Sequence, residues 1–371
     1  MASACGENGN VLSGAGAPNA AWQASISQTS GVVPSDNTSI LKRLDKDVAI
    51  GSTVDAKNGD AGPHALSVVQ ATFGLKRGQL VVCNFANKAG KAGKGSTIEV
   101  LNPKPGSKHV RFAESKDILG CTGDALSAGN DVFGAGWGSH ILEEFDQDGE
   151  PLDAFGPPIV GPFADADAFC SVSYYPEYIY EGDAKTGSIV HFSVNLYGNP
   201  TEVQVIAGFA INKGKGWGVL GPSGIQYDGR RRASLCNDTL YIVDGVDNTI
   251  VAVSNSSSLL LKNEIVVKPG GKTFKCLYKK TTCAKLVYAG SPLDAPYAST
   301  LLPNGNLIVA NTAGGNKLVE LTPAGKVLAI KAVDKSARAH VFGLASIGTS
   351  DTNTVVYYTT TADNTVHELV P

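Results

Sequence analysis

Short apolar runs separated by turn residues recur along most of the chain. The clearest unit, residues 297–333, contains four such runs: YASTLL, NLIVA, KLVEL and VLAIKA. Pro-Asn-Gly, Ala-Gly-Gly-Asn and Pro-Ala-Gly separate them, and these residues supply the fixed or positive φ that a tight chain reversal needs. The unit therefore predicts a meander of four short antiparallel strands.

The same pattern is found in five further stretches. A second clear copy covers residues 221–255, and weaker copies lie at 64–114, 123–156, 169–208 and 340–370. Four-stranded meanders repeated at this spacing are typical of blades arranged around a central axis. We therefore predict an all-β fold, a six-bladed β-propeller with four-stranded antiparallel blades.

The last copy has only three strands, so another segment must complete its sheet. Residues 38–44, TSILKRL, precede the first blade and have alternating apolar positions that suit an outer strand. We expect this N-terminal strand to close the last blade. Residues 262–296 are long enough to hide a seventh blade, but we interpret them as a blade edge with a hairpin.

Residues 240–253, LYIVDGVDNTIVAV, resemble the NHL repeat, and the series of copies is similar to the SMP-30-like six-bladed propellers. The resemblance implies a single propeller domain over residues 37–371. Residues 1–36 are rich in Ala, Ser, Gly and Asn, which predicts a flexible leader. Because this fold hosts hydrolases, lyases and binding scaffolds, the resemblance leaves the function open.

Composition and charge narrow the classes of partner. The net charge is −3 with mixed signs, so nothing indicates a nucleic-acid partner. No stretch approaches the roughly 18 apolar residues of a membrane-spanning helix. A closed propeller leaves only short strand edges for association, so we expect a monomer.

Sulfur usage predicts an oxidising compartment. Methionine occurs only at position 1, and the seven cysteines include no CxxC pair, so disulfides are the expected use. Cys276 and Cys283 flank a hairpin-like CLYKKTTC segment and are predicted to be bonded to each other. We expect a secreted protein, extracellular or periplasmic, and Cys5 in a small-residue run is a candidate lipid-anchor site.

Candidate site residues come from the geometry of a propeller. The innermost strand of each blade starts on the face where the second strand ends, so these positions meet at one mouth of the central channel. The residues predicted there include His64, Thr122 or Asp124, Tyr297 and His340 at strand starts, and Asn84, Glu181, Asp244 and Asn311 at strand ends.

A divalent metal ion is the cofactor that these residues suggest. His64 and His340 belong to the first and last blades, which adjoin in a closed ring, and two imidazoles with a carboxylate suit zinc or copper. Alternatively, both histidines only hydrogen-bond nearby carbonyls.

The oxygen ligands at the strand ends suit calcium instead, which takes six or more carboxylate and amide oxygens. The SMP-30-like lactonases are similar in using Glu, Asn and Asp ligands at the channel. Asp244 and Asn311 could also have a purely structural role, by accepting hydrogen bonds from the amides of the following turn.

Two functions are compatible with these residues. The first is a secreted protein that binds a small molecule or a protein at the channel mouth, where Trp137 of GAGWGS lines a pocket and Tyr297, Asn84 and Asn311 add contacts. Alternatively, Trp137 only packs within its glycine-flanked loop. The second is a metal-dependent hydrolase or lyase with Glu181 or Asp244 as the base. We favour the binding protein.

Overall fold

The computed structural model describes residues 37–70, 72–127, 129–156, 163–171, 177–194, 201–212, 218–229, 238–336 and 338–371. The predicted leader, residues 1–36, and Cys5 within it lie outside the described residues.

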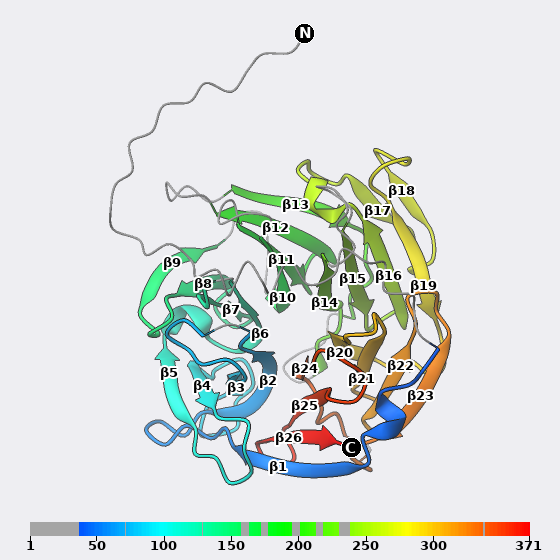
Figure 1. Cartoon of the computed structure of the whole chain (residues 1–371). Helices are drawn as coiled ribbons and strands as arrows, with labels where there is room; N and C mark the ends of the chain where they lie inside the picture. The colour runs from blue at the N-terminus through cyan, green and yellow to red at the C-terminus, as the bar shows by residue number, and fades with distance from the viewer. Residues whose placement is uncertain are drawn as a thin grey trace, which may run out of the picture.

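Six β-sheets stand around a common axis, with the chain passing from one sheet to the next (Figure 1). This is the six-bladed propeller that the repeats predicted. The first three blades contain β2 (Ala61–Val68), β3 (Leu80–Ala86), β4 (Thr97–Leu101) and β5 (Val110–Glu114); β6 (Cys121–Leu126), β7 (Val132–Gly136), β8 (Ile141–Phe145) and β9 (Pro151–Phe155); and β10 (Phe163–Ser171), β11 (Glu177–Asp183), β12 (Ser188–Val194) and β13 (Thr201–Ala207).

The other three blades follow the same antiparallel order, and the last one takes its outer strand from the N-terminal part of the chain. They contain β14 (Pro222–Asp228), β15 (Thr239–Asp244), β16 (Thr249–Ser254) and β19 (Ala284–Ala289); β20 (Pro296–Leu301), β21 (Leu307–Asn311), β22 (Lys317–Leu321) and β23 (Val327–Ala332); and β24 (Leu344–Ile347), β25 (Val355–Thr360), β26 (Thr365–Val370) and β1 (Lys46–Ser52).

Each blade packs between two neighbours, and the middle strands are therefore apolar on both faces. In β3, Val81 and Cys83 pack in one cluster with Phe145 of the second blade. The alternate residues, Leu80 and Val82, pack with Tyr357 of the sixth blade. Because side chains alternate along a strand, one strand serves two interfaces. This explains why the middle strands read as continuous apolar runs.

The sixth blade is closed by β1, which pairs with β26 from Lys46↔Val370 to Ser52↔Thr365. An N-terminal closing strand was predicted, but its assignment to residues 38–44 was wrong. That segment contains the 3-10 helix η1 (Leu41–Arg43), and Ile40, Leu41 and Leu44 are fully buried against the fifth and sixth blades. The spacing of these three apolar residues is that of one turn of a helix. From the sequence alone, the same apolar residues were interpreted as the alternation of a β-strand.

A buried carboxylate, Glu320 of β22, holds this N-terminal segment in place. Its oxygens accept hydrogen bonds from the Ser39 hydroxyl at 2.5 Å and from the backbone amides of Ile40 at 3.1 Å and Leu41 at 2.9 Å. Asn306 of the same blade donates a fourth bond at 3.1 Å. Three of the four donors to this carboxylate thus come from about 280 residues away along the chain.

Residues 262–296 form a blade edge and a disulfide-clipped hairpin, as interpreted from the sequence. Two short strands, β17 (Ile265–Val267) and β18 (Phe274–Cys276), extend the third blade beyond β13, and the chain then enters β19 of the fourth blade. The predicted Cys276–Cys283 disulfide is present and joins the edges of these two blades.

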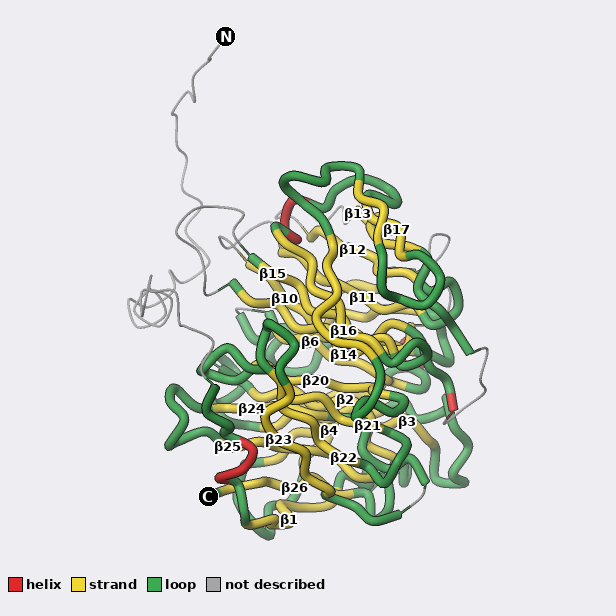
Figure 2. Tube along the Cα trace, turned by 90° about the vertical axis from the view of Figure 1, so that its right-hand side faces the viewer, coloured by secondary structure: helices red, strands yellow, loops and turns green. Residues whose placement is uncertain are grey.

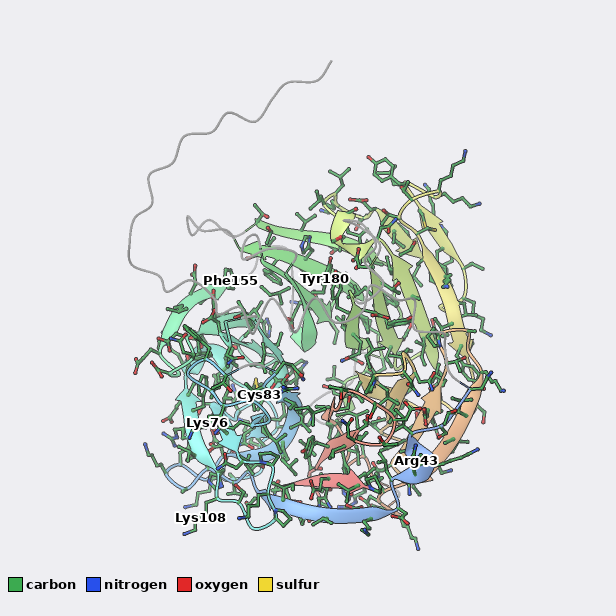
Figure 3. All side chains as sticks on the ribbon, viewed as in Figure 1. Arg43, Lys76, Cys83, Lys108, Phe155 and Tyr180 are labelled. Carbon is green, nitrogen blue, oxygen red and sulfur yellow. A yellow bond between two sulfur atoms is a disulfide. The ribbon has the colours of Figure 1, made fainter. Side chains whose placement is uncertain are left out.

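A second disulfide, between Cys83 of β3 and Cys121 of β6, was not predicted. It links the first and second blades across a sequence separation of 38 residues, and Figure 3 shows the sulfur at Cys83 inside the ring rather than on its rim. Among the described residues, no helix is long and apolar enough to cross a membrane.

We predict that Glu320→Ala unfolds at lower denaturant concentration than the unmodified protein. Three donors of residues 39–41 would lose their acceptor in a buried site, at a cost of about 1–3 kcal/mol each, so the loss should be at least about 3 kcal/mol. Replacing the exposed Glu150 by alanine is the matched control. Equal unfolding midpoints for the two variants would contradict this role of Glu320.

The two disulfides should contribute unequally to stability. In the chain-entropy description, closing a loop of 38 residues stabilises a fold by about 1.5 kcal/mol more than closing a loop of 7. Replacing both Cys83 and Cys121 by serine should therefore lower the free energy of unfolding by more than the same change at Cys276 and Cys283. The reverse order in equilibrium unfolding would contradict this expectation.

Candidate functional site

The strand register brings several predicted residues to equivalent places at one end of the ring. Asn84 is the partner of Pro63, Asp244 of Pro222 and Asn311 of Pro296, so each lies at or within two residues of the end of the second strand of its blade, beside the start of the innermost strand. The structure thus places Asn84, Asp244 and Asn311 on one end of the propeller, each in a different blade.

These three side chains hold neighbouring loops. Asp244 Oδ1 accepts the amides of Val246 at 3.0 Å and Asp247 at 3.2 Å, which is the structural alternative considered from the sequence. Asn84 donates to the Thr53 carbonyl at 2.8 Å, and Asn311 donates to the Pro292 carbonyl at 2.8 Å. Each residue therefore ties the end of a second strand to a loop.

In the third blade, the equivalent of Asp244 is Asp183. Asp183 is the partner of Phe163 at the start of β10, and its Oδ1 accepts the amides of Lys185 at 2.7 Å and Thr186 at 3.2 Å. Glu181, the residue that we had selected, lies two positions earlier and is fully buried. The Asp-x-x-x-Gly turn from Asp183 to Gly187 is the sequence signal that would have identified Asp183.

Aromatic rings from four consecutive blades gather at this end. The imidazole of His64 lies between the rings of Phe85 and Phe342, with centroid distances of 4.2 and 4.0 Å, and Tyr297 meets it edge-on at 5.9 Å. Phe85 in turn contacts Trp137 at 5.9 Å. We call these five residues the aromatic cluster.

Trp137 is the outermost member of the aromatic cluster and is only half-buried. Its indole lies over Gly93 in the loop between β3 and β4, so closely that a Cβ at Gly93 would come within 2.6 Å of the ring. Gly93 also has a φ of 73°, which favours glycine. The cluster therefore combines three predicted residues, His64, Trp137 and Tyr297, with two that the sequence did not reveal, Phe85 and Phe342.

The two predicted metal-binding histidines have different surroundings. His64 is 2% exposed, and burial lowers its pKa to about 3, against a smaller opposing effect from the Gly62 backbone. His340 lies in the loop before β24, where its Nδ1 is 2.6 Å from Asp334 Oδ2. Burial alone would raise the pKa of Asp334, but hydrogen bonds from Ser336 and His340 bring it below the usual value.

A buried acid lies on the inner strand of the second blade, at one of the two positions, Thr122 or Asp124, that the sequence placed at its start. Asp124 of β6 is 1% exposed and accepts a hydrogen bond from the Ser67 hydroxyl of the first blade at 2.8 Å. Its Oδ2 has no hydrogen-bond partner among the described residues, and burial raises its pKa to about 7. A carboxyl group with this pKa exchanges a proton near neutrality.

Within the described ranges, no three His, Cys, Asp or Glu side chains come together as ligands for a metal ion. The pairing of His64 with His340 and the calcium set around Glu181 and Asp244 stay predictions. Asp244 Oδ2 has no hydrogen-bond partner in the described part of the chain, and burial raises the pKa of this carboxyl group to about 6, with the turn amides opposing the rise.

Comparisons with known proteins show the fold. No protein-family model and no curated protein matches the chain. Among solved structures, the virginiamycin B lyase of Staphylococcus aureus is similar with a TM-score of 0.52 and 13% identity over 88% of this chain and 98% of that one. A gluconolactonase from Xanthomonas campestris has a TM-score of 0.54 and 10% identity over 88% and 96% of the two chains.

A third neighbour, a protein of unknown function from Bacteroides thetaiotaomicron, has a TM-score of 0.52 and 9% identity over 87% of this chain and 74% of its own. At these identities, the likeness shows that the chain shares the architecture of lyase and lactonase propellers. This similarity does not show that residues at equivalent positions have the same role in the two proteins.

The burial of His64 predicts a loss of stability in acid. Because the pKa of His64 is about 3 in the folded protein and about 6.5 in the unfolded chain, the unfolded chain takes up the proton first as the pH falls. This linkage should remove about 2 kcal/mol between pH 7 and pH 5. The loss should be absent in His64→Phe, which keeps an aromatic ring in the stack. Parallel stability curves for the two proteins over this range would contradict the prediction.

Proposed function

We propose that the protein is a secreted, NHL-like propeller that binds a small ligand at the end of the ring where Trp137 lies. The observation that carries the proposal is the aromatic cluster. Rings from four blades form one contiguous group, and its outer member, Trp137, is partly exposed. Aromatic side chains at the mouth of a rigid fold are typical of sites that bind apolar or planar groups.

The environment of His64 supports binding rather than proton transfer at the aromatic cluster. A pKa of about 3 keeps the imidazole neutral at physiological pH, so it acts as a packed aromatic ring. Asp244 and Asn311 hold loops at the same end of the propeller. These contacts give the site a fixed shape, which lowers the entropic cost of binding.

Secretion is supported by the chemistry of sulfur. Two disulfides link separate blades, and disulfides persist in oxidising compartments. The absence of methionine after position 1 has the same explanation, since this residue is readily oxidised.

A thermal-shift screen of small molecules on the unmodified protein and on Trp137→Ala tests the binding site. A ligand at one hundred times its dissociation constant should stabilise the unmodified protein by about 2.7 kcal/mol, and the variant should lose most of that gain. Tyr278→Ala, an exposed aromatic on the rim, is the control and should retain it. Ligands that stabilise Trp137→Ala as much as the unmodified protein would show that they bind away from Trp137. If no small molecule in the screen stabilises the unmodified protein, a protein partner is favoured.

A metal-dependent hydrolase or lyase is the second candidate. It is supported by the Asp244 carboxyl, whose Oδ2 is without a hydrogen-bond partner in the described residues and whose pKa is raised to about 6. The lyase and lactonase activities named for two structural neighbours agree with this chemistry. Zinc, copper or calcium would polarise a substrate carbonyl or activate water, with Asp244 or Glu181 as the base.

Metal analysis of the purified protein distinguishes the two candidates. For the enzyme, we expect a stoichiometric divalent metal that is lost either in His64→Ala and His340→Ala or, for calcium, in Asp244→Asn. If the purified protein contains no metal and still binds the small molecule found in the thermal-shift screen, the binding function is supported and the metal-dependent enzyme is not.

A further inference from the structure

A small part of the rim, at the free end of the β17–β18 extension, has an unusual surface. Exposed leucines and a tyrosine lie beside lysines in two neighbouring turns of the chain. We call this surface the rim tip; it comprises Leu260, Leu261, Lys262, Leu277, Tyr278, Lys279 and Lys280. The apolar members are between 48% and 60% exposed, although a folded protein normally buries such side chains.

Hydrogen bonds and a disulfide hold the two turns together. Glu264 is almost fully buried, and its Oε1 accepts the amides of Leu260 at 2.7 Å and Leu261 at 2.5 Å. The backbone carbonyl of Glu264 accepts the amide of Leu277 at 2.8 Å. The Cys276–Cys283 bond closes the second turn at its base. The leucines are therefore presented by a fixed scaffold.

Charge is concentrated around the rim tip. Residues 260–287 contain seven of the 31 lysines and arginines but only one of the 34 acidic residues, the buried Glu264, so this segment carries +6 in a chain whose net charge is −3. All seven lysines are exposed; they are Lys262, Lys268, Lys272, Lys275, Lys279, Lys280 and Lys285. The surface of the segment is thus strongly basic.

The rim tip lies away from the aromatic cluster. β17 runs parallel to β13 with Ile265 opposite Ile206, and the tip precedes β17 and follows β18, so it lies on the outer edge of the third blade. The aromatic cluster is formed by the first, second, fifth and sixth blades instead. In Figure 2, the loops beside β17 and β13 form the end of the molecule farthest from β1 and β26.

We propose that the rim tip docks the propeller on an anionic lipid bilayer. Leucine and tyrosine side chains on projecting turns can enter the interfacial region of a bilayer, while adjacent lysines stay at the level of the lipid phosphates. Basic residues near such a surface are attracted by its negative potential. An acidic protein would use the same lysines, but the projecting shape and the pairing of leucine with lysine in both turns favour a lipid surface.

Co-sedimentation of the full chain with vesicles tests the proposal. The protein should bind vesicles of phosphatidylcholine and phosphatidylglycerol in equal amounts, and should bind pure phosphatidylcholine far more weakly. Replacing Lys279 and Lys280 by alanine should weaken binding about 25-fold, from roughly fivefold for each lysine. Leu277→Ser with Tyr278→Ser, which leaves the charge unchanged, should weaken it about tenfold or more.

The matched control replaces Lys104 and Lys108 by alanine and the exposed Val110 by serine, on the outer edge of the first blade, where Figure 3 shows Lys108 on the rim. This control should bind as the unmodified protein does, and thermal unfolding should show that every variant is folded. The proposal would be overturned if the control substitutions weakened vesicle binding as much as the rim-tip substitutions do. It would also be overturned if Leu277→Ser with Tyr278→Ser left vesicle binding unchanged. Binding to polyglutamate without binding to the vesicles would overturn it in favour of an acidic protein partner.

Discussion

The closure of the ring is the constraint on which the rest of the structure depends. Each middle strand is apolar on both faces, so a blade is stable only between two neighbours, and the first and sixth blades must meet. The pairing of β1 with β26 completes the last sheet from the other end of the chain. Glu320 adds a buried anchor for the residues before β1, which fixes where the N-terminal segment crosses from the fifth blade to the sixth.

The closed ring also determines which polar side chains are already hydrogen-bonded to the backbone and which could take part in a reaction. The turns at one end need acceptors for their backbone amides, and Asp183 and Asp244 supply them in equivalent positions of two blades. These carboxylates therefore have structural partners, and a functional role must be compatible with them. Asp124 differs, because it accepts a bond from Ser67 of the neighbouring blade and keeps one oxygen without a partner among the described residues.

The two proposed surfaces follow from different parts of the repeat. The aromatic cluster uses positions present in every blade, namely the starts of inner strands and the ends of second strands, filled here by rings in four consecutive blades. The rim tip instead belongs to an extension found at the edge of the third blade, where β17 and β18 lengthen the sheet. A ligand at the aromatic cluster and a lipid surface at the outer edge of the third blade would not compete for the same residues.

The sequence by itself determined the six blades, the N-terminal closing strand and the Cys276–Cys283 bond, because strand periodicity, turn residues and a short cysteine spacing are local signals. It did not determine that residues 46–52, rather than 38–44, form the closing strand, since both lie near the first blade and only contacts with the fifth and sixth blades distinguish them. The same reason applies to the Cys83–Cys121 bond, the Glu320 anchor and the stacking of His64 between Phe85 and Phe342. These interactions join residues that are distant in the chain, and only the packing of one blade against the next brings them within contact distance.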